Sequence, residues 1–403
     1  MMSESTLLDA TTAMLDPSPG PAPGSPAHLV ADWTAFRSAF PTTERFVYLD
    51  TANKALLPVW TEQAMRGFMA DIYERAGRAA FSMASVEEAR DDIAAFVGAP
   101  RECLALIKNT SEGMNIVAHG LRVGQGDNVV FSEFEHENNT FPWRFLARKG
   151  VDIRIVKGAP DGRVPLDAYR EAIDNRTKIV SVAWVAYGNG FRSDVPSLAE
   201  IAHQRGAKLV VDAIQAVGIL DRRIDSLGAD FVVSGGHKTL LSPAGAGIFY
   251  VEPNLLEEIE PAYAAKFSFS SLDRTIPDLR LSEDAHRFEY GNPNFLGIWL
   301  QRRSAQILES VGLGRIEARV RTLTTRLIEG LDSMSIPVRT PRAWLDRCGI
   351  VSLIPSGNAE AAVGRLRERN IVVSQKDGFV RASIHAYNDE DDIDAFLSAL
   401  RGL

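Results

Sequence analysis

The segment from residue 207 to residue 251 constrains the fold most, because it holds two apolar strands that each deliver polar side chains at their end. The first, AKLVVDAIQAVG, runs directly into Asp212 and, three residues later, Gln215. The second, ADFVVSGGHKTLLSPAGAGIFYV, leads into the glycine-bracketed pair His237 and Lys238 and then a Gly-rich turn before another strand. In open α/β sheets, ligands bind beyond the carboxyl ends of the strands. We therefore expect Asp212 and Lys238 to face the same crevice.

An aspartate and a lysine that share a crevice match what pyridoxal 5'-phosphate requires. The lysine forms a Schiff base with the aldehyde, and the aspartate keeps the pyridinium nitrogen protonated, so the ring accepts electrons from a carbanion. Burial lowers the pKa of an amine, which favours the neutral, nucleophilic form of Lys238. Taken alone, Asp212 fits a turn cap and Lys238 a solvated loop residue equally well. The pair at this spacing favours the cofactor.

Composition and charge narrow the possible partners. The chain of 403 residues is 45% hydrophobic and 24% charged, which is ordinary for a soluble globular protein with one large and one smaller domain. Its formal net charge is −8 without a basic block, so nucleic acids and anionic membranes are poor partners. We expect neither a membrane span nor a secretory signal, because no long apolar run occurs and the first residues carry acids.

The two cysteines, Cys103 and Cys348, lie far apart and form no CxxC motif. They predict neither a disulfide framework nor a zinc site, and we expect no metal. A reducing cytoplasm fits this cysteine usage best.

The order of patterns predicts two domains. Residues 16–27 are rich in Pro, Gly and small residues and cannot bury a core, so we predict that residues 1–28 are a flexible tail without a catalytic role. Strand and helix patterns then alternate through residues 29–294, which predicts a large α/β domain with a mostly parallel, doubly wound sheet. A small C-terminal α/β domain is expected over residues 295–403.

Two other strand ends are candidates for cofactor contacts. CLALIKNTSEGMN is a strand that leads into Thr110 and Ser111 at the start of a helix, where free amides and the helix dipole favour a phosphate. The same residues also fit an ordinary N-cap. After the strand DNVVFSEF, one of His136, Glu137 and Asn138 is expected to cover the cofactor ring, and a helix cap built from Asn139 and Thr140 is the alternative.

Three residues are candidates for the substrate. Asn53, in the turn after RFVYLD, and Tyr187, after an apolar strand, are placed to reach a ligand. Arg381 lies on the alternating strand VRASIHAYN. An arginine grips a carboxylate through two parallel hydrogen bonds that a lysine cannot reproduce, so we expect Arg381 to bind the substrate carboxylate. An edge-strand surface charge is the alternative.

These stretches together resemble the class V aminotransferases, a group of fold-type I pyridoxal-phosphate enzymes that includes cysteine desulfurases, kynureninase and isopenicillin N epimerase. The resemblance runs from about Tyr48 to the C-terminus. The motifs that carry it are, in order, YLDTAN, NTSEGMN, EHENNTFPW, VVDAIQAVG, GGHKTLLSPAGAG, RFEYGNPN and VRASIHAYN. The resemblance implies the fold-type I architecture and a small amino-acid substrate.

The resemblance also implies roles at the cofactor ring and the substrate. By position, Lys238 is the Schiff-base lysine and Asp212 the partner of the pyridine nitrogen. Gln215 is the donor to the ring hydroxyl, and Arg381 is the substrate carboxylate clamp.

At the phosphate, the resemblance implies contacts from two subunits. Thr110, Ser111 and His237 match the residues that hold the phosphate within one chain. Asn292 matches the turn that reaches the phosphate of the neighbouring subunit, where many relatives have threonine, and an amide also donates there. The resemblance therefore implies a homodimer with shared active sites.

The chain departs from the cysteine desulfurases at two further points. NIVVSQKDGFVRAS is short and lacks the nucleophilic cysteine that those enzymes carry before the arginine strand, and Cys348 lies too early. At the ring-stacking position, His136 is followed by Glu137 and not by a second histidine.

The expected reaction follows from these departures. We expect amino-acid chemistry through a carbanion at Cα, either transamination or β-elimination with C–S cleavage, without a cysteine persulfide. An epimerase or cyclase of a biosynthetic pathway is the first alternative. A non-catalytic binding protein on the same fold is the second.

Overall fold

A computed structural model of the chain describes residues 32–273, 275 and 277–402. Its centre is a seven-stranded sheet, in which β8 is antiparallel to both of its neighbours and the strands from β7 to β4 are parallel. The strands, in their order across the sheet, are β2 (Leu104–Ile107), β8 (Gly247–Val251), β7 (Phe231–Gly235), β6 (Lys208–Asp212), β5 (Thr177–Ala183), β3 (Asn128–Ser132) and β4 (Asp152–Val156). The prediction of an α/β fold with a mostly parallel sheet is confirmed.

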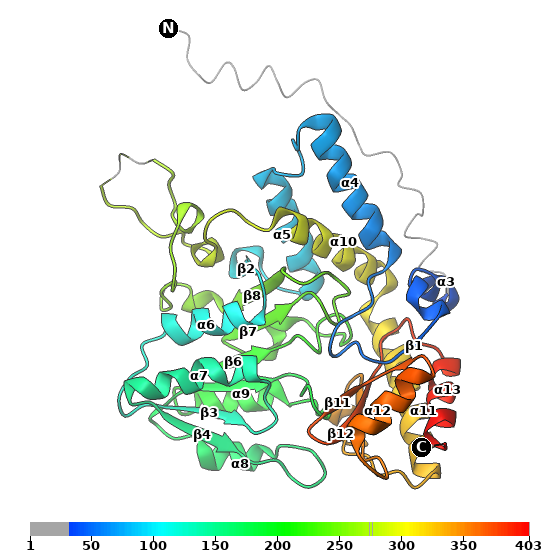
Figure 1. Cartoon of the computed structure of the whole chain (residues 1–403). Helices are drawn as coiled ribbons and strands as arrows, with labels where there is room; N and C mark the ends of the chain where they lie inside the picture. Colours follow the sequence, from blue (N-terminus) through cyan, green and yellow to red (C-terminus); the bar gives the residue numbers. More distant parts are fainter. Residues whose placement is uncertain (1–31, 274, 276, 403) are drawn as a thin grey trace.

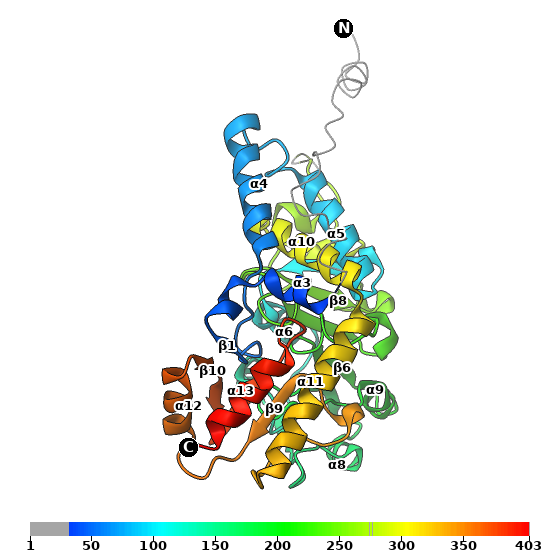
Figure 2. The same cartoon turned by 90° about the vertical axis from the view of Figure 1, so that its right-hand side faces the viewer.

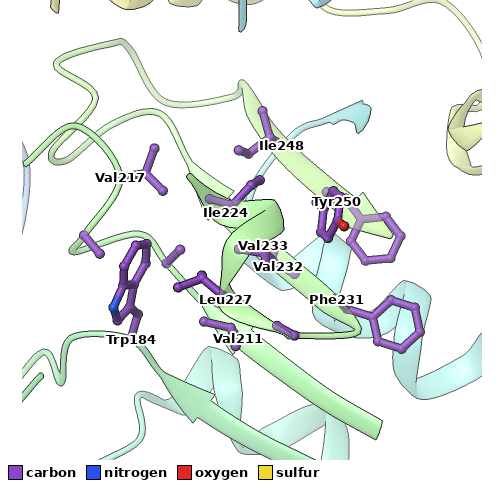
Figure 3. Packing of buried hydrophobic residues seen from close by; sticks show 14 of the residues in the cluster. Trp184, Val211, Val217, Ile224, Leu227, Phe231, Val232, Val233, Ile248 and Tyr250 are labelled. Atoms are coloured by element: carbon purple, nitrogen blue, oxygen red, sulfur yellow. The ribbon is translucent and has the colours of Figure 1, made fainter. Parts of the chain in front are cut away.

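The central strands are buried along their whole length because helices cover the sheet. Helix α6 (Thr110–Gly120) packs beside α7 (Phe141–Leu146) (Figure 1), and α8 (Leu166–Ala172) packs beside α9 (Val195–His203) (Figure 2). Within the core, Figure 3 shows Val211 of β6 and Val233 of β7 packed with Ile224 and Leu227, which come from the short 3₁₀ turn after β6. This apolar packing fixes the strand ends that carry the site.

Three helices form a separate layer beside β2. Helix α10 (Phe295–Val311) packs against both α4 (Val59–Arg75) and α5 (Met83–Val97). Figures 1 and 2 show α4 extending beyond the sheet at this end of the molecule. The short helix α3 (Trp33–Ser38) precedes them in the chain.

A second hydrophobic core lies in the C-terminal part of the chain. Its elements are α11 (Leu313–Ser333), β9 (Ile350–Leu353), α12 (Ala359–Glu368), β10 (Ile371–Val372), β11 (Ser374–Lys376), β12 (Phe379–Ser383) and α13 (Glu390–Leu400). Strand β12 lies between β11 and β9 in an antiparallel sheet. Strand β1 (Val47–Tyr48) pairs in parallel with β10, and Leu49 packs into this second core, so an N-terminal segment joins the C-terminal elements.

The predicted tail, residues 1–28, lies outside the described residues. The domain boundaries at residues 29, 294 and 295 stay predictions. None of the helices that the structure describes has the length and apolar character needed to cross a bilayer.

Candidate active site

A cavity of about 220 Å³ lies where the carboxyl ends of the central strands meet. Asp212 ends β6, and Lys238 follows β7, the strand that pairs with β6 in parallel. Both line the cavity, as the sequence led us to expect. The predicted site residues that line it are Asn53, Thr110, His136, Tyr187, Asp212, Gln215, His237, Lys238 and Arg381.

Burial shifts the pKa values of the central pair in opposite directions. It raises the pKa of Asp212 to about 6, although the Ile214 N–H, 3.0 Å from Oδ1, and the positive charge of Lys238 favour the carboxylate. Burial lowers the pKa of Lys238 to about 8; the charge of Asp212 opposes this shift, and that of Arg381 adds to it. An amine with this pKa is partly neutral at pH 7, as a nucleophile or base must be.

Hydrogen bonds fasten the loop after β1 to this centre. The side-chain amide of Gln215 donates to the Ala52 carbonyl at 2.9 Å, and the Ala55 N–H donates to the His237 carbonyl at 3.0 Å. Gln215 thereby keeps one of its two amide N–H groups for a ligand. Asn53 reaches the cavity from this loop and donates to Asp50 at 3.1 Å.

The start of α6 offers an anion site. Asn109 caps the helix by accepting from the Glu112 N–H at 3.0 Å, so the cap that the sequence allowed for Thr110 or Ser111 belongs to Asn109. The Thr110 hydroxyl is buried at the edge of the cavity and has no hydrogen-bond partner in the described protein. Ser111 is half-buried and does not line the cavity.

His136 and Tyr187 form one wall of the cavity. Their rings are 4.8 Å apart in an edge-to-face arrangement. Burial, with the positive charge of Lys238, lowers the pKa of His136, which favours the neutral imidazole that stacks well on an aromatic ring. Glu137 is exposed and does not line the cavity.

A buried polar network holds this wall in place. Glu135 is 8% exposed and accepts hydrogen bonds from Ser132 at 2.8 Å, Asn139 at 2.7 Å and the Ala183 N–H at 2.8 Å. Burial raises the pKa of Glu135 to about 8. Because Ala183 ends β5 and pairs with Asp212, the network joins the His136 segment to the strand that pairs with β6 at Asp212.

Arg381 lies in the cavity wall with only 1% of its surface exposed. Its Nε donates to the Ser374 hydroxyl at 3.0 Å, and Nη1 donates to the Tyr187 carbonyl at 2.9 Å. Nη2 pairs with Asp50 at 3.3 Å. Three of the five N–H groups are thus used, and one remains on each terminal nitrogen, which is the fork that a carboxylate accepts.

Asn292 lies elsewhere. It is exposed, and it lines a separate cavity of about 40 Å³ together with Lys108 and Tyr290. This placement leaves its predicted contact with a neighbouring subunit untested.

Among the polar residues that line the main cavity, sequence reasoning passed over Lys376. Lys54 and Asn138 lie in the two stretches that the sequence marked as able to reach a ligand, and Asn109 directly precedes the predicted Thr110. The sequence signal for Lys376 was weak. Lys376 lies five residues before Arg381, and only the pairing of β11 with β12 brings it to the cavity.

The residues present fit pyridoxal phosphate. The unpartnered Thr110 hydroxyl at a helix start suits the phosphate, and His237 lines the cavity nearby. Asp212 keeps its Oδ2 free of hydrogen bonds among the described residues, which suits a pyridine nitrogen. When bound, this cofactor withdraws electrons from the substrate's α-carbon.

Comparisons with known proteins agree with this geometry. The model of the family described as aminotransferase class-V matches residues 47–396. A probable cysteine desulfurase of Pyrococcus abyssi is 30% identical over 389 residues, covering 91% of this chain and 96% of the relative. The apo structure of a cysteine desulfurase from Thermococcus onnurineus NA1 has a TM-score of 0.82 at 30% identity, covering 91% of this chain and 98% of that one. C-DES, described with glycine covalently linked to its pyridoxal-phosphate cofactor, shares the fold at 20% identity, with a TM-score of 0.82 and coverage of 90% and 98%.

These comparisons correct the expected reaction. We predicted transamination or β-elimination without a cysteine persulfide, and that prediction is wrong, because the relatives that match nine-tenths of the chain are cysteine desulfurases. They support neither the epimerase or cyclase nor the non-catalytic binding protein any better. The predicted reaction was wrong because the prediction rested on one short hairpin, whereas the pocket is assembled from segments along the whole chain. The chain belongs to the class V aminotransferase family, has the fold-type I architecture and uses pyridoxal 5'-phosphate.

Proposed function

We propose that this chain is a cysteine desulfurase, which breaks the C–S bond of L-cysteine and passes the sulfur atom to a thiol. The observation that carries the proposal is the single cavity that joins Lys238, Asp212 and Arg381, in a chain that matches cysteine desulfurases over 91% of its length. In the net reaction, one C–S bond breaks and one S–S bond forms with the acceptor's sulfur. The acceptor becomes a persulfide, its proton ends on the substrate's β-carbon, and alanine is released.

Three residues of the cavity have defined tasks in this proposal. The free fork of Arg381 binds the substrate carboxylate and thereby fixes the α-carbon. Lys238, with a pKa of about 8, takes the α-proton in its neutral form and returns a proton to carbon. Asp212 holds negative charge against the ring nitrogen, where a cationic partner offsets the cost of burying its carboxylate.

The acceptor thiol comes from a second molecule in this proposal. Cys103 and Cys348 are both fully buried, and neither lines the cavity. Burial also raises the pKa of Cys103 to about 11 and that of Cys348 to about 12, so both are protonated at neutral pH. We propose that a small thiol or a protein thiol enters the cavity mouth and carries the persulfide away.

The test is to incubate the cofactor-loaded chain with L-cysteine and dithiothreitol and to measure alanine and sulfide. One alanine for each sulfide supports the proposal, and pyruvate with ammonia would overturn it. Lys238→Ala is the negative control. A Cys103→Ala, Cys348→Ala double variant should keep the alanine yield, and intact mass measurement should find no added sulfur on the chain. An added sulfur atom would refute the external acceptor but would leave the proposed desulfurase reaction standing.

We also propose that the chain is a homodimer with shared sites. Met65, Met69 and Tyr73, spaced four residues apart on α4, expose 39%, 36% and 78% of their surface along one face, which suits a covered interface. Asn292 is exposed outside its own chain's cofactor cavity, as a residue that serves the partner must be.

Sedimentation of the cofactor-loaded protein tests this assembly. Met69→Glu places a charge on the apolar face and should give monomers that lose cofactor. Gln63→Glu, on a different face of α4, is the matched control and should stay dimeric. A monomeric unaltered chain would refute the homodimer.

A further inference from the structure

Lys376 reaches the active-site cavity through the geometry of a tight hairpin. Strands β11 and β12 are joined by Asp377 and Gly378, whose φ values are +51° and +84°, as a two-residue hairpin turn of type I′ requires. In this register, Ser374 lies opposite Arg381, and Lys376 lies opposite Phe379. Alternate residues of a strand share a face, so Ser374 and Lys376 point to one side and Gln375 to the other.

The side that Lys376 faces is the substrate side. Ser374, on that face, accepts the hydrogen bond from Nε of Arg381 at 3.0 Å. Lys376 lines the same cavity as Arg381 and is half-buried, whereas Gln375 is exposed and does not line it. Ser374 and Lys376 are about 7 Å apart along the strand, so the side chain of Lys376 starts from the same face as the hydroxyl that holds Arg381.

The charge of Lys376 has no partner within the described residues, where its ammonium makes no ion pair or hydrogen bond. Arg381 differs, since Asp50 already balances part of its charge. Among the described residues, Asp212 is the only one whose carboxylate lines the cavity, and its charge interacts with that of Lys238. Burial is the main cause of the lowered pKa of both Lys238 and His136, and the charge of Lys376 adds to both shifts, so it acts inside the site. An uncompensated cation beside a carboxylate clamp favours a ligand that carries a second negative charge.

We propose that Lys376 binds an anionic group on the β-carbon of the substrate, so that the cavity selects amino acids with two acidic groups. The α-carboxylate binds Arg381, and the second anion, a sulfinate, carboxylate or ionised sulfur, binds Lys376. The inference rests on the proposed function only in taking the substrate to be an α-amino acid.

The test measures binding, through the change in cofactor absorbance when the holoenzyme is titrated with amino acids. The dianionic probes are L-cysteine sulfinate and L-aspartate, and the monoanionic probes are L-alanine and L-serine. Lys376→Gln should weaken binding of the dianionic probes about tenfold, as expected for the loss of one charge-assisted hydrogen bond. It should change the affinity for the monoanionic probes less than about twofold. Lys376→Arg should restore most of the loss. Added salt should reduce the preference of the unaltered protein for the dianionic over the monoanionic probes.

The matched control is Gln375→Glu, which makes the same change of one charge unit on the opposite face of the hairpin. Gln375→Glu should change the affinity for either class of probe by less than about twofold. Equal weakening of all four probes by Lys376→Gln would overturn the proposal and assign Lys376 to the α-carboxylate. No change with any probe would remove Lys376 from the site. Because the assay needs no C–S cleavage, failure of the proposed desulfurase reaction is seen separately, in the alanine yield from L-cysteine.

Discussion

Replacement of Arg381 by lysine gives the sharpest test of the proposed substrate clamp. The positive charge is kept, but the planar fork is lost. In the native structure, Ser374, Tyr187 and Asp50 occupy three of the five N–H groups, which leaves one on each terminal nitrogen. A lysine ammonium has three N–H groups on one atom and cannot serve these partners together with both oxygens of a carboxylate.

The magnitude follows from the hydrogen bonds. Two charge-assisted bonds join the fork to a carboxylate, and a lysine retains one of them at best. One such bond contributes about 1.5 to 3 kcal/mol. At about 1.4 kcal/mol for each factor of ten, Arg381→Lys should weaken binding of a carboxylate substrate roughly 10- to 150-fold.

The assay compares L-alanine with L-alaninamide, which differ only at the carboxylate, by titration of the cofactor absorbance. The affinity ratio of the two ligands should fall at least tenfold in Arg381→Lys, because only L-alanine uses the fork. Arg192→Lys is the control, since Arg192 lies outside the cavity and pairs with Glu317 at 3.5 Å. An unchanged ratio in a folded Arg381→Lys protein would show that the carboxylate binds elsewhere.

Two further predictions concern the cofactor end of the site. Burial raises the pKa of Asp212 from 3.8 to about 6, so in the cofactor-free protein its contribution to stability is fully present below pH 3.8 and is lost as pH rises through 6. The full loss is about 3 kcal/mol. In urea titrations from pH 4 to 7, the difference in unfolding free energy between the native chain and Asp212→Asn should change by most of that amount. A constant difference would contradict the prediction. Thr110→Val removes a buried hydroxyl without an internal partner, so the unfolding free energy of the cofactor-free protein should stay within about 1 kcal/mol while the Kd for the cofactor rises about tenfold. Unfolding and cofactor titrations measure both, and an unchanged Kd would remove Thr110 from the phosphate site.

Much of the site could be predicted because its residues stand directly at strand ends. Apolar runs locate β6 and β7, and Asp212 at the end of β6 and Lys238 three residues after β7 then have little choice of position. Parallel strands place their carboxyl ends together, so the sequence order of strands and polar residues already implies one crevice. Ser111 and Glu137 show the limit of this reasoning, because a one-residue rotation in a helix turn or loop decides which neighbour faces the cavity.

What the sequence determined by itself is the set of local elements and the chemistry at their ends, since hydrophobic periodicity and turn residues act over a few positions. Only the tertiary structure decided which distant segments complete the cavity. The pairing of β11 with β12 carries Lys376 to the site, and the C-terminal strand sets Arg381 against Asp50, more than 300 residues earlier in the chain. Such contacts depend on how two hydrophobic cores pack and on strand register, and neither is encoded in the spacing of nearby residues.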